Sequence, residues 1–140
     1  MKIKCIFMFF LIFNFSQLKA GKLKINVKNI EDKVGLIHFA LYDKAEFFPD
    51  KKGKILGLVK ETSEIYEVGL LIDDLDESIY AVAIFHDENS NNKFDTFLSI
   101  PQEKYGFSND APVFFGPPSF EDASFHLGKN DFVEINIELK

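Results

Sequence analysis

Arginine is absent from the 140-residue chain, and this lack narrows the range of partners. Arginine is the side chain best suited to bidentate recognition of phosphate or guanine. The 22 acidic residues outnumber the 16 basic ones, all of them lysine, and the net charge of −6 repels a polyanion. We therefore expect no nucleic acid among the partners of this chain.

Apolar runs long enough to span a membrane are lacking as well. Lys2 and Lys4 precede an apolar run over 5–13, which is followed by a polar stretch and by Ala20. A transmembrane helix needs about 20 apolar residues, whereas the core of a signal peptide needs about 7 to 15. The pattern predicts a signal peptide over 1–20, export to the periplasm or the extracellular space, and no transmembrane anchor after cleavage.

Cysteine is confined to Cys5, inside the predicted signal peptide. Cleavage after Ala20 also removes three lysines and moves the net charge from −6 to about −9. The mature chain then has neither a thiol nucleophile nor a disulfide, so its apolar core, with or without a metal, must hold it together. Residues 21–140 are within the usual size of a single domain.

Alternation of apolar and polar residues predicts an all-β domain. Leu23, Ile25 and Val27 alternate with polar residues, which is typical of a half-buried strand. Similar patterns, or apolar runs rich in β-branched and aromatic residues, recur along the chain. We predict strands over 22–28, 34–42, 65–72, 79–85, 120–127 and 132–139, and an irregular connection over 47–54.

The turn-like segments 31–33 and 73–78 favour two hairpins, each joining the strands on either side of the turn. Residues 87–118 are rich in Asn, Asp, Ser, Gly and Pro with interspersed Phe, which indicates a long ordered loop. Short strands without intervening helices favour an antiparallel β-sandwich, Ig-like or transthyretin-like, with this loop following a central strand.

The start of the long loop carries a dense set of oxygen ligands. Calcium takes six to eight oxygen ligands, and an EF-hand loop supplies them from alternate positions. Asn92 occupies the sixth position, which normally needs a residue tolerant of positive φ. The candidate ligands are Asp87, Asn89, Asn91, the backbone carbonyl of Lys93, and Asp95, at positions one, three, five, seven and nine.

The loop departs from an EF-hand at its twelfth position, where Leu98 replaces the glutamate that closes the site. A closing oxygen then comes from water or from elsewhere in the chain. Such a site has modest affinity, on the order of 10⁻⁴ to 10⁻³ M. Without a metal, the Asp and Asn side chains cap their own backbone in successive turns. Carboxylates elsewhere that we consider as closing ligands are Asp73, Asp74, Glu121 and Asp122.

A set of short motifs stands out in the mature chain: YAVAIFHDEN at 80–89, Asn91, Asp95, Ile100-Pro101, Glu103, YGFSN at 105–109 and PSFEDA at 118–123. With these motifs the sequence resembles the domain of unknown function 2141 family of exported bacterial proteins over most of the mature chain. Ser90 and Asn92 stand where the family is commonly rich in glycine. The resemblance implies an exported β domain and brings no established reaction or substrate.

Two groups of residues admit a catalytic interpretation. His86, together with Asp87, is a candidate base or metal ligand, although it also suits a structural role in bracing the loop. A three-histidine zinc site requires the fold to bring His38 and His126 to His86. Aromatic and polar residues near the second half of the loop either line a pocket or anchor the loop. The candidate pocket residues are His86, Phe107, Ser108 and Phe120, with Phe114 and Phe115 beside them.

We expect an exported, non-enzymatic β-sandwich whose calcium-stabilised loop presents a surface for a protein or a glycan. The competing hypothesis is an extracytoplasmic hydrolase that uses His86 and Asp87 in a pocket beside the aromatic loop. The fold separates the two, because the first requires carboxylates and amides that converge on one point, and the second requires an open pocket around the histidine.

Overall fold

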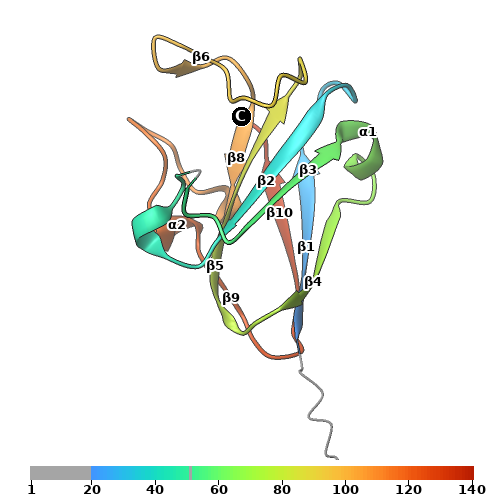
Figure 1. The fold of residues 1–140 in the computed structure, drawn as a ribbon, viewed down its shortest axis with the longest axis vertical. Coiled ribbons are helices and arrows are strands. Elements are labelled where there is room, and N and C mark those ends of the chain that lie inside the picture. Colours follow the sequence, from blue (N-terminus) through green and yellow to red (C-terminus); the bar gives the residue numbers. More distant parts are fainter. Residues whose placement is uncertain (1–19, 51) are drawn as a thin grey trace, which may run out of the picture.

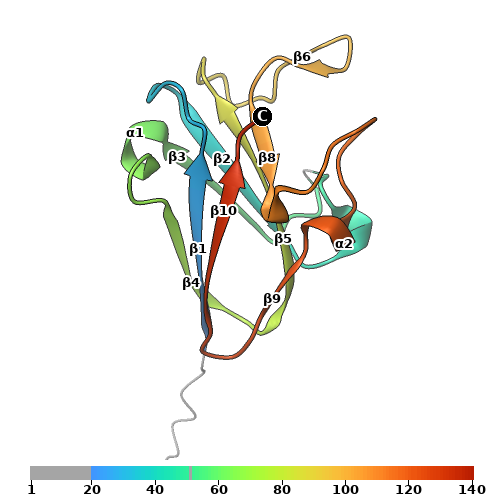
Figure 2. The ribbon, with the colours of Figure 1, turned by 180° about the vertical axis from the view of Figure 1, so that it is seen from behind.

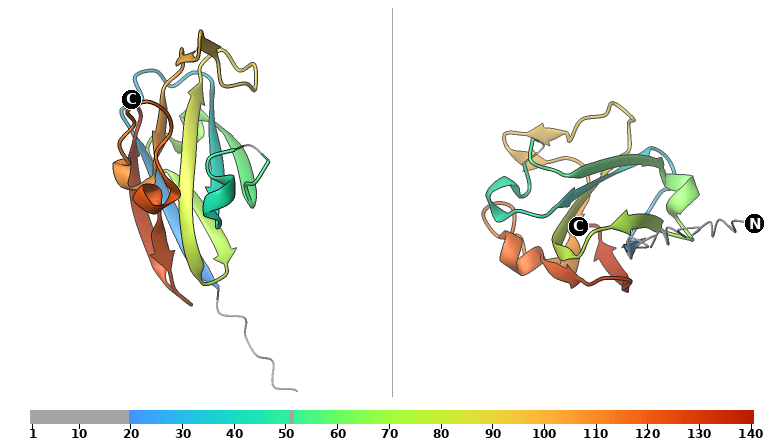
Figure 3. Two further views of the ribbon diagram at one scale, coloured as in Figure 1. Left: turned by 90° about the vertical axis from the view of Figure 1, so that its left-hand side faces the viewer. Right: turned by 60° about the horizontal axis from the view of Figure 1, so that its bottom comes forward.

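The structure, a computed structural model, describes residues 20–50 and 52–140. The predicted signal peptide lies outside the described residues except for Ala20. Two β-sheets face each other across one apolar core, surrounded by loops and single-turn helices (Figures 1 and 3). This arrangement confirms the predicted all-β sandwich. In the described part of the chain, no helix has the length and apolar character that crossing a membrane requires.

The smaller sheet, of order β10-β1-β4, contains the first and last strands of the domain. Its central strand β1 (Gly21–Lys28) is antiparallel to β4 (Leu70–Leu75) and parallel to β10 (Phe132–Glu138). Inward-facing residues of β1 and β10 alternate with exposed ones, as the sequence predicts. The β1–β10 pair is thus a parallel exception in a sandwich whose other pairings are antiparallel.

The larger sheet has the order β3-β2-β5-β8, and the short strand β9 pairs with the beginning of β5. β2 (Leu36–Tyr42) and β5 (Ser78–Asp87) form its centre. β3 (Leu56–Glu61) flanks β2, whereas β8 (Tyr105–Phe107) and β9 (Phe125–Leu127) flank β5. The long loop therefore starts from a central strand, which confirms that prediction.

The remaining elements are short and lie in the connections. β6 (Thr96–Phe97) and β7 (Ile100–Pro101) pair with each other to form a small hairpin that projects beyond the end of β5 (Figure 1). The other elements are η1 (Ala45–Phe47), α1 (Thr62–Ile65), η2 (Ser108–Asp110) and α2 (Phe120–Ala123).

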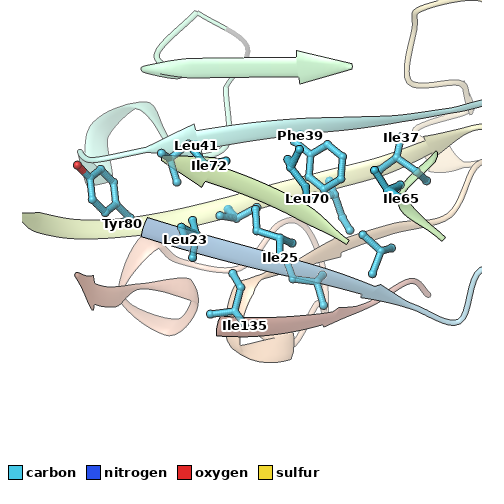
Figure 4. Close-up of a cluster of buried hydrophobic side chains, with 14 of the residues drawn as sticks. Leu23, Ile25, Ile37, Phe39, Leu41, Ile65, Leu70, Ile72, Tyr80 and Ile135 are labelled. Atoms are coloured by element: carbon cyan, nitrogen blue, oxygen red, sulfur yellow. The ribbon is translucent and has the colours of Figure 1, made fainter. Parts of the chain in front are cut away.

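The apolar core lies between the two sheets (Figure 4). Leu23 and Ile25 of β1 and Ile37 of β2 have no exposed surface. Burying an aliphatic side chain of this size contributes about 1.5–3 kcal/mol relative to leaving it exposed. The predicted inward face of β2, namely Ile37, Phe39 and Leu41, is confirmed, with His38 on the opposite face. This core supplies the stability of a domain that has no disulfide.

The end of the chain joins the two sheets on one side, where β8 lies beside β10 (Figure 2). Tyr105 and Lys140 exchange two backbone hydrogen bonds, with N···O distances of 3.3 and 2.9 Å. Gly106 is required at this junction, because a Cβ atom there would lie 2.7 Å from the carbonyl oxygen of Glu138. The junction fixes β8, and with it the returning end of the long loop.

Both predicted hairpins are wrong. β1 and β2 belong to different sheets, and so do β4 and β5, so the turns between them cross from one sheet to the other. A period of two identifies a strand and its buried face but does not identify the partner strand. In a sandwich, consecutive strands that share one core satisfy the same pattern whether they pair or face each other.

Two predicted strand boundaries are also wrong, and the sequence does not indicate one further strand. The strand predicted over 65–72 begins only at Leu70, because Thr62–Ile65 forms α1 and Gly69 adopts a φ of +69°. The strand predicted over 120–127 is helical in its first half, where the Ser119 side chain caps α2. β3, which directly follows the lysine-rich connection 47–54, was not predicted, since its buried face is only half-covered at the sheet edge.

Candidate functional site

The candidate calcium loop is held at both ends by the larger sheet. It leaves the end of β5 at Asp87 and returns to β8, which pairs with β5 through the register Phe85↔Tyr105. The backbone N–H of His86 also donates to the carbonyl oxygen of Lys104 at 2.8 Å. Residues 88–103 therefore form a loop whose two ends are held by neighbouring strands of one sheet. This limits the positions that the loop can adopt.

Asp87 is the anchor of this loop, and its side chain has no exposed surface. One carboxylate oxygen accepts the N–H of Asn91 at 3.0 Å, and the other accepts the N–H of Asn92 at 2.7 Å. The second oxygen also lies 3.2 Å from His38 Nε2. Burial favours a raised pKa for Asp87, but the two backbone hydrogen bonds and His38 outweigh it and hold the pKa below its ordinary value. Asp87 is thus an anion in the folded protein at neutral pH.

The side chains at loop positions three, five and nine meet at one point. The amide nitrogens of Asn89 and Asn91 both donate to Asp95 Oδ2, each at 2.8 Å. Their Oδ1 atoms accept the backbone N–H groups of Asn91 and Lys93, at 3.0 and 2.8 Å. Asn92 has a φ of +61°, which the predicted sixth position requires. The sequence spacing thus correctly predicts that Asn89, Asn91 and Asp95 lie together.

Glu103 is a member of this cluster that the spacing of the loop does not indicate. Its Oε2 accepts the backbone N–H of Asp95 at 3.0 Å, and the residue is only 8% exposed. Its Oε1 is buried without any hydrogen-bond partner. Burial raises the pKa of Glu103; the Asp95 N–H opposes this, and the charges of Asp95, Asp87 and Glu88 add to it. The available signal was its inclusion among the residues that carry the family resemblance.

The carboxylates considered as closing ligands from elsewhere lie in other environments. Asp73 pairs with Lys22 at 3.2 Å on β4, which ends at the opposite end of the sandwich from the β6–β7 hairpin (Figure 1). Asp122 and Ser119 form hydrogen bonds with each other at the start of α2. Asp74 and Glu121 belong to the same two elements. The contacts of Asp73 and Asp122 thus lie outside the loop, whereas Glu103 is a carboxylate beside Asp95.

His86 is buried, with 1% of its surface exposed. Its Nε2 lies 2.7 Å from the carbonyl oxygen of Val34 and 3.3 Å from Thr62 Oγ1. Because a carbonyl can only accept, Nε2 carries the hydrogen, and Nδ1 is buried without a hydrogen-bond partner, 3.9 Å from Glu88 Oε1. The ring therefore ties β5 to the segment before β2, which agrees with the structural role considered for it.

The catalytic interpretation of His86 and Asp87 receives no support from this geometry. Adjacent residues of a strand point to opposite faces, and both side chains are buried. A three-histidine site is also not formed, since His38 contacts Asp87 whereas His126 lies 3.9 Å from Glu77. The histidines thus occupy three separate environments.

Of the candidate pocket residues, Phe107, Ser108 and Phe120 pack the second half of the loop, whereas the neighbouring Phe114 and Phe115 are exposed. Phe48 makes ring contacts with Phe107 and Phe120, at centroid distances of 5.8 and 5.9 Å. Ser108 has no exposed surface, and its Oγ accepts the backbone N–H of Val82 at 2.8 Å and donates to the carbonyl oxygen of Ala123. Phe107 and Ser108 thus anchor the loop and line no open surface.

Apolar side chains are exposed on the β6–β7 hairpin. Phe97, Leu98 and Ile100 are 65%, 81% and 62% exposed. The turn residues Leu98 and Ser99 both have positive φ, of 48° and 64°, which is typical of a type I′ hairpin turn. A leucine at positive φ is unusual and strained. The tip therefore exposes an apolar side chain where Asn or Gly would fit the backbone better.

The part of the chain that the structure describes holds no group of three His, Cys, Asp or Glu side chains already placed to bind a metal ion. Asp87, Asp95 and Glu103 are thus not arranged as a ready metal site. Asn89 and Asn91 carry amide oxygens of the kind that calcium binds, but they turn their nitrogens to Asp95. The residue types fit calcium, because their carboxylate, amide and backbone carbonyl groups all carry oxygen. Binding requires the two amide nitrogens to move away from Asp95.

Comparison with known proteins gives one finding. No curated protein and no solved structure matches the chain. The family model described as "Uncharacterized protein conserved in bacteria (DUF2141)" matches residues 25–135, which include the loop and most of both sheets. The chain therefore belongs to the DUF2141 family of bacterial proteins.

Proposed function

We propose that this protein is an exported, non-enzymatic binding module in which the loop after β5 is stabilised by calcium. The carrying observation is the convergence of Asn89 and Asn91 on Asp95, in a loop that starts at the buried carboxylate of Asp87. These residues occupy the alternate positions from which a calcium loop supplies its ligands. Export follows from the predicted signal peptide over 1–20.

Uncompensated negative charge at the loop supports a cation. Asp87, Asp95 and Glu103 are neighbours, and two of them are buried. Among the residues that the structure describes, His38 is the only basic side chain that pairs with any of the three, through Asp87. Like charges held together at low exposure repel one another more strongly than they do in water. A divalent ion relieves this repulsion and links the three carboxylates.

The surface that the loop presents is the apolar β6–β7 hairpin. Phe97, Leu98 and Ile100 are exposed at a projecting tip, and two of these three side chains are aliphatic. Glycans are recognised mainly by the flat faces of aromatic rings, whereas protein partners accept aliphatic and aromatic anchors alike. We therefore favour a protein partner over a glycan. The ion orders the loop and takes no part in a reaction.

The first test of this proposal is calcium titration of the mature chain, residues 21–140, by calorimetry. We expect heat of binding at millimolar calcium or below, and a higher melting temperature in calcium than in chelator. Asp95→Asn removes a ligand charge while keeping the side-chain size, so both effects should weaken. Asp73→Asn on β4 is the matched control and should bind as the parent does. Absence of heat and of any melting shift at millimolar calcium would reject the calcium loop.

A further inference from the structure

Glu103 is a buried carboxylate that lies outside the first twelve positions of the loop. It follows β7 and precedes β8, and it is 8% exposed. Oε2 is satisfied by the Asp95 N–H, but Oε1 has no hydrogen-bond partner and is out of contact with solvent. A buried oxygen of a carboxylate without a partner is costly, because water no longer solvates it. The site therefore suits either a cation or a proton at Oε1.

The β6–β7 hairpin explains how a residue so far along the chain reaches the loop. Thr96 pairs with Pro101 and Phe97 with Ile100, so the chain goes out and returns on itself. The N–H of Gln102 then donates to the carbonyl oxygen of Asp95 at 2.9 Å. The hairpin lies between Asp95, at the ninth position of the loop, and Glu103. Because it folds back on itself, it brings Glu103 beside Asp95.

We propose that Glu103 is the calcium ligand that closes the loop begun by Asp87, in the role that Leu98 cannot fill at the twelfth position. The inference rests on the proposed function and deepens it by naming the missing carboxylate. Oε1 supplies the free ligand atom, and Oε2 keeps the bond to Asp95 or shares the ion. The donors are then carboxylate and amide oxygens from both ends of the loop, which is the hard-oxygen environment that calcium prefers.

Glu88 is the other acidic side chain near the cluster, and its geometry is unsuitable. Its side chain is 54% exposed, and its Oε1 lies 3.9 Å from His86 Nδ1. Water solvates such a carboxylate, so its charge needs no ion. Glu88 and Glu103 therefore form a matched pair of the same residue type, and the charge of Glu88 contributes to the raised pKa of Glu103.

Closure by Glu103 connects the ion to the exposed hairpin. Asp95 precedes the hairpin that carries Phe97, Leu98 and Ile100, and Glu103 follows it. An ion bound to both Asp95 and Glu103 restricts how the hairpin moves against β5 and β8. Calcium should therefore slow hydrogen exchange of backbone amides over 96–101, although none of these residues is itself a ligand.

The test compares Glu103→Gln with Glu88→Gln in the mature chain, using calcium chloride titration by calorimetry and melting in chelator. We expect Glu103→Gln to weaken calcium binding by about tenfold or more, since it removes a ligand charge. In chelator it should melt at or above the parent temperature, because the amide removes an uncompensated buried charge. Glu88→Gln should bind calcium within about twofold of the parent, which is the effect of a solvated charge.

The outcomes separate the inference from the function on which it rests. Binding of calcium by Glu103→Gln with the parent affinity overturns the role of Glu103 and leaves the calcium loop standing. Absence of binding by the parent overturns the proposed function itself. A variant that melts lower in chelator yet keeps the parent's calcium-induced shift shows that Glu103 is only structural, which also overturns the inference.

Two further readouts keep the test decisive if Glu103→Gln folds poorly. Glu103→Asp retains the charge but withdraws the carboxylate by one methylene, so it should also lose calcium affinity while keeping the fold. Hydrogen exchange over 96–101 should slow on adding calcium to the parent and to Glu88→Gln, and remain unchanged in Glu103→Asp. Equal slowing in all three chains contradicts closure of the loop by Glu103.

Discussion

The backbone N–H of Asp95 donates a hydrogen bond to Glu103 Oε2 at 3.0 Å, across the base of the β6–β7 hairpin. This bond joins Asp95, at the ninth position of the candidate calcium loop, to a carboxylate eight residues later in the chain. The loop of Asp and Asn residues thus has an acidic side chain at each end, Asp87 at its start and Glu103 at its close.

Asp87→Ala should destabilise the domain even without calcium. The change leaves the N–H groups of Asn91 and Asn92 and the ring of His38 without their acceptor. A fully buried unpaired donor costs about 1–3 kcal/mol. These three hydrogen bonds are only partly buried, so we expect about 1 kcal/mol for each and a total loss of about 2–4 kcal/mol. Urea unfolding in chelator measures it, with Asp73→Ala as a control that should lose about 0.5 kcal/mol or less. Equal stability of parent and Asp87→Ala would show that the carboxylate does not organise the loop.

Gly106→Ala should weaken the junction between β8 and β10. The added Cβ would lie 2.7 Å from both Glu138 O and Ile137 Cγ2, so the strands must separate. Overpacking of this kind costs about 1–3 kcal/mol. Gly57→Ala on β3 is the control, because its Cβ meets only the movable end of the Lys54 side chain. Urea unfolding should rank the control close to the parent and well above Gly106→Ala, and the reverse order would contradict the junction.

Leu98→Asn should stabilise the hairpin turn. Asn tolerates positive φ better than leucine, and Leu98 is 81% exposed, so little packing is lost. We expect the free energy of unfolding to rise by about 0.5–1 kcal/mol, as measured by urea unfolding. A strained and exposed leucine that is kept at a cost to stability fits a surface that binds a partner. Destabilisation by Leu98→Asn would instead mean that the leucine packs against the protein.

The stability of the domain should fall above pH 10, and Tyr42 should account for part of the fall. Burial, and next the charge of Asp50, raise the pKa of Tyr42, whose hydroxyl donates to the carbonyl oxygen of Pro49 at 3.0 Å. The folded state thus keeps the phenol proton at pH values where the unfolded chain releases it. This contribution to stability is complete below the unfolded pKa of about 10 and is lost as pH rises through the folded value.

Tyr42→Phe removes that titration, so its stability should decline less steeply than the parent's as the pH rises above about 10. At pH 7 the variant loses one hydrogen bond, which is worth about 1 kcal/mol. Urea unfolding over a series of pH values provides the comparison. An identical slope in parent and variant would show that Tyr42 does not contribute to the alkaline loss.

Much of the fold can be predicted from the alternation of apolar and polar residues, because the sequence of a strand decides which of its faces is buried. Leu23, Ile25 and Val27 were placed correctly for this reason, as was the inward face of β2. The pairing of β1 with β10 could not be derived in this way. It joins residues more than a hundred positions apart in parallel, and many partners offer an equally apolar face.

The same distinction between local and distant contacts applies to the candidate site. Asp87 to Asp95 form a local loop, so their spacing predicted which side chains meet at Asp95. Glu103 reaches the cluster only because an apolar hairpin folds back on itself, and nothing in the spacing of the loop shows that detour. The burial of His86 likewise depends on Val34 and Thr62, which come from distant segments.

The most direct measurement is a crystal structure of the mature chain grown with millimolar calcium chloride. The account predicts one ion within about 2.3–2.6 Å of oxygens from Asp87, Asn89, Asn91, Asp95 and Glu103, the range of calcium–oxygen distances in proteins. The amide nitrogens of Asn89 and Asn91 would then have turned away from Asp95. A structure at that calcium concentration in which both nitrogens still donate to Asp95, with no ion between the carboxylates, would contradict the account.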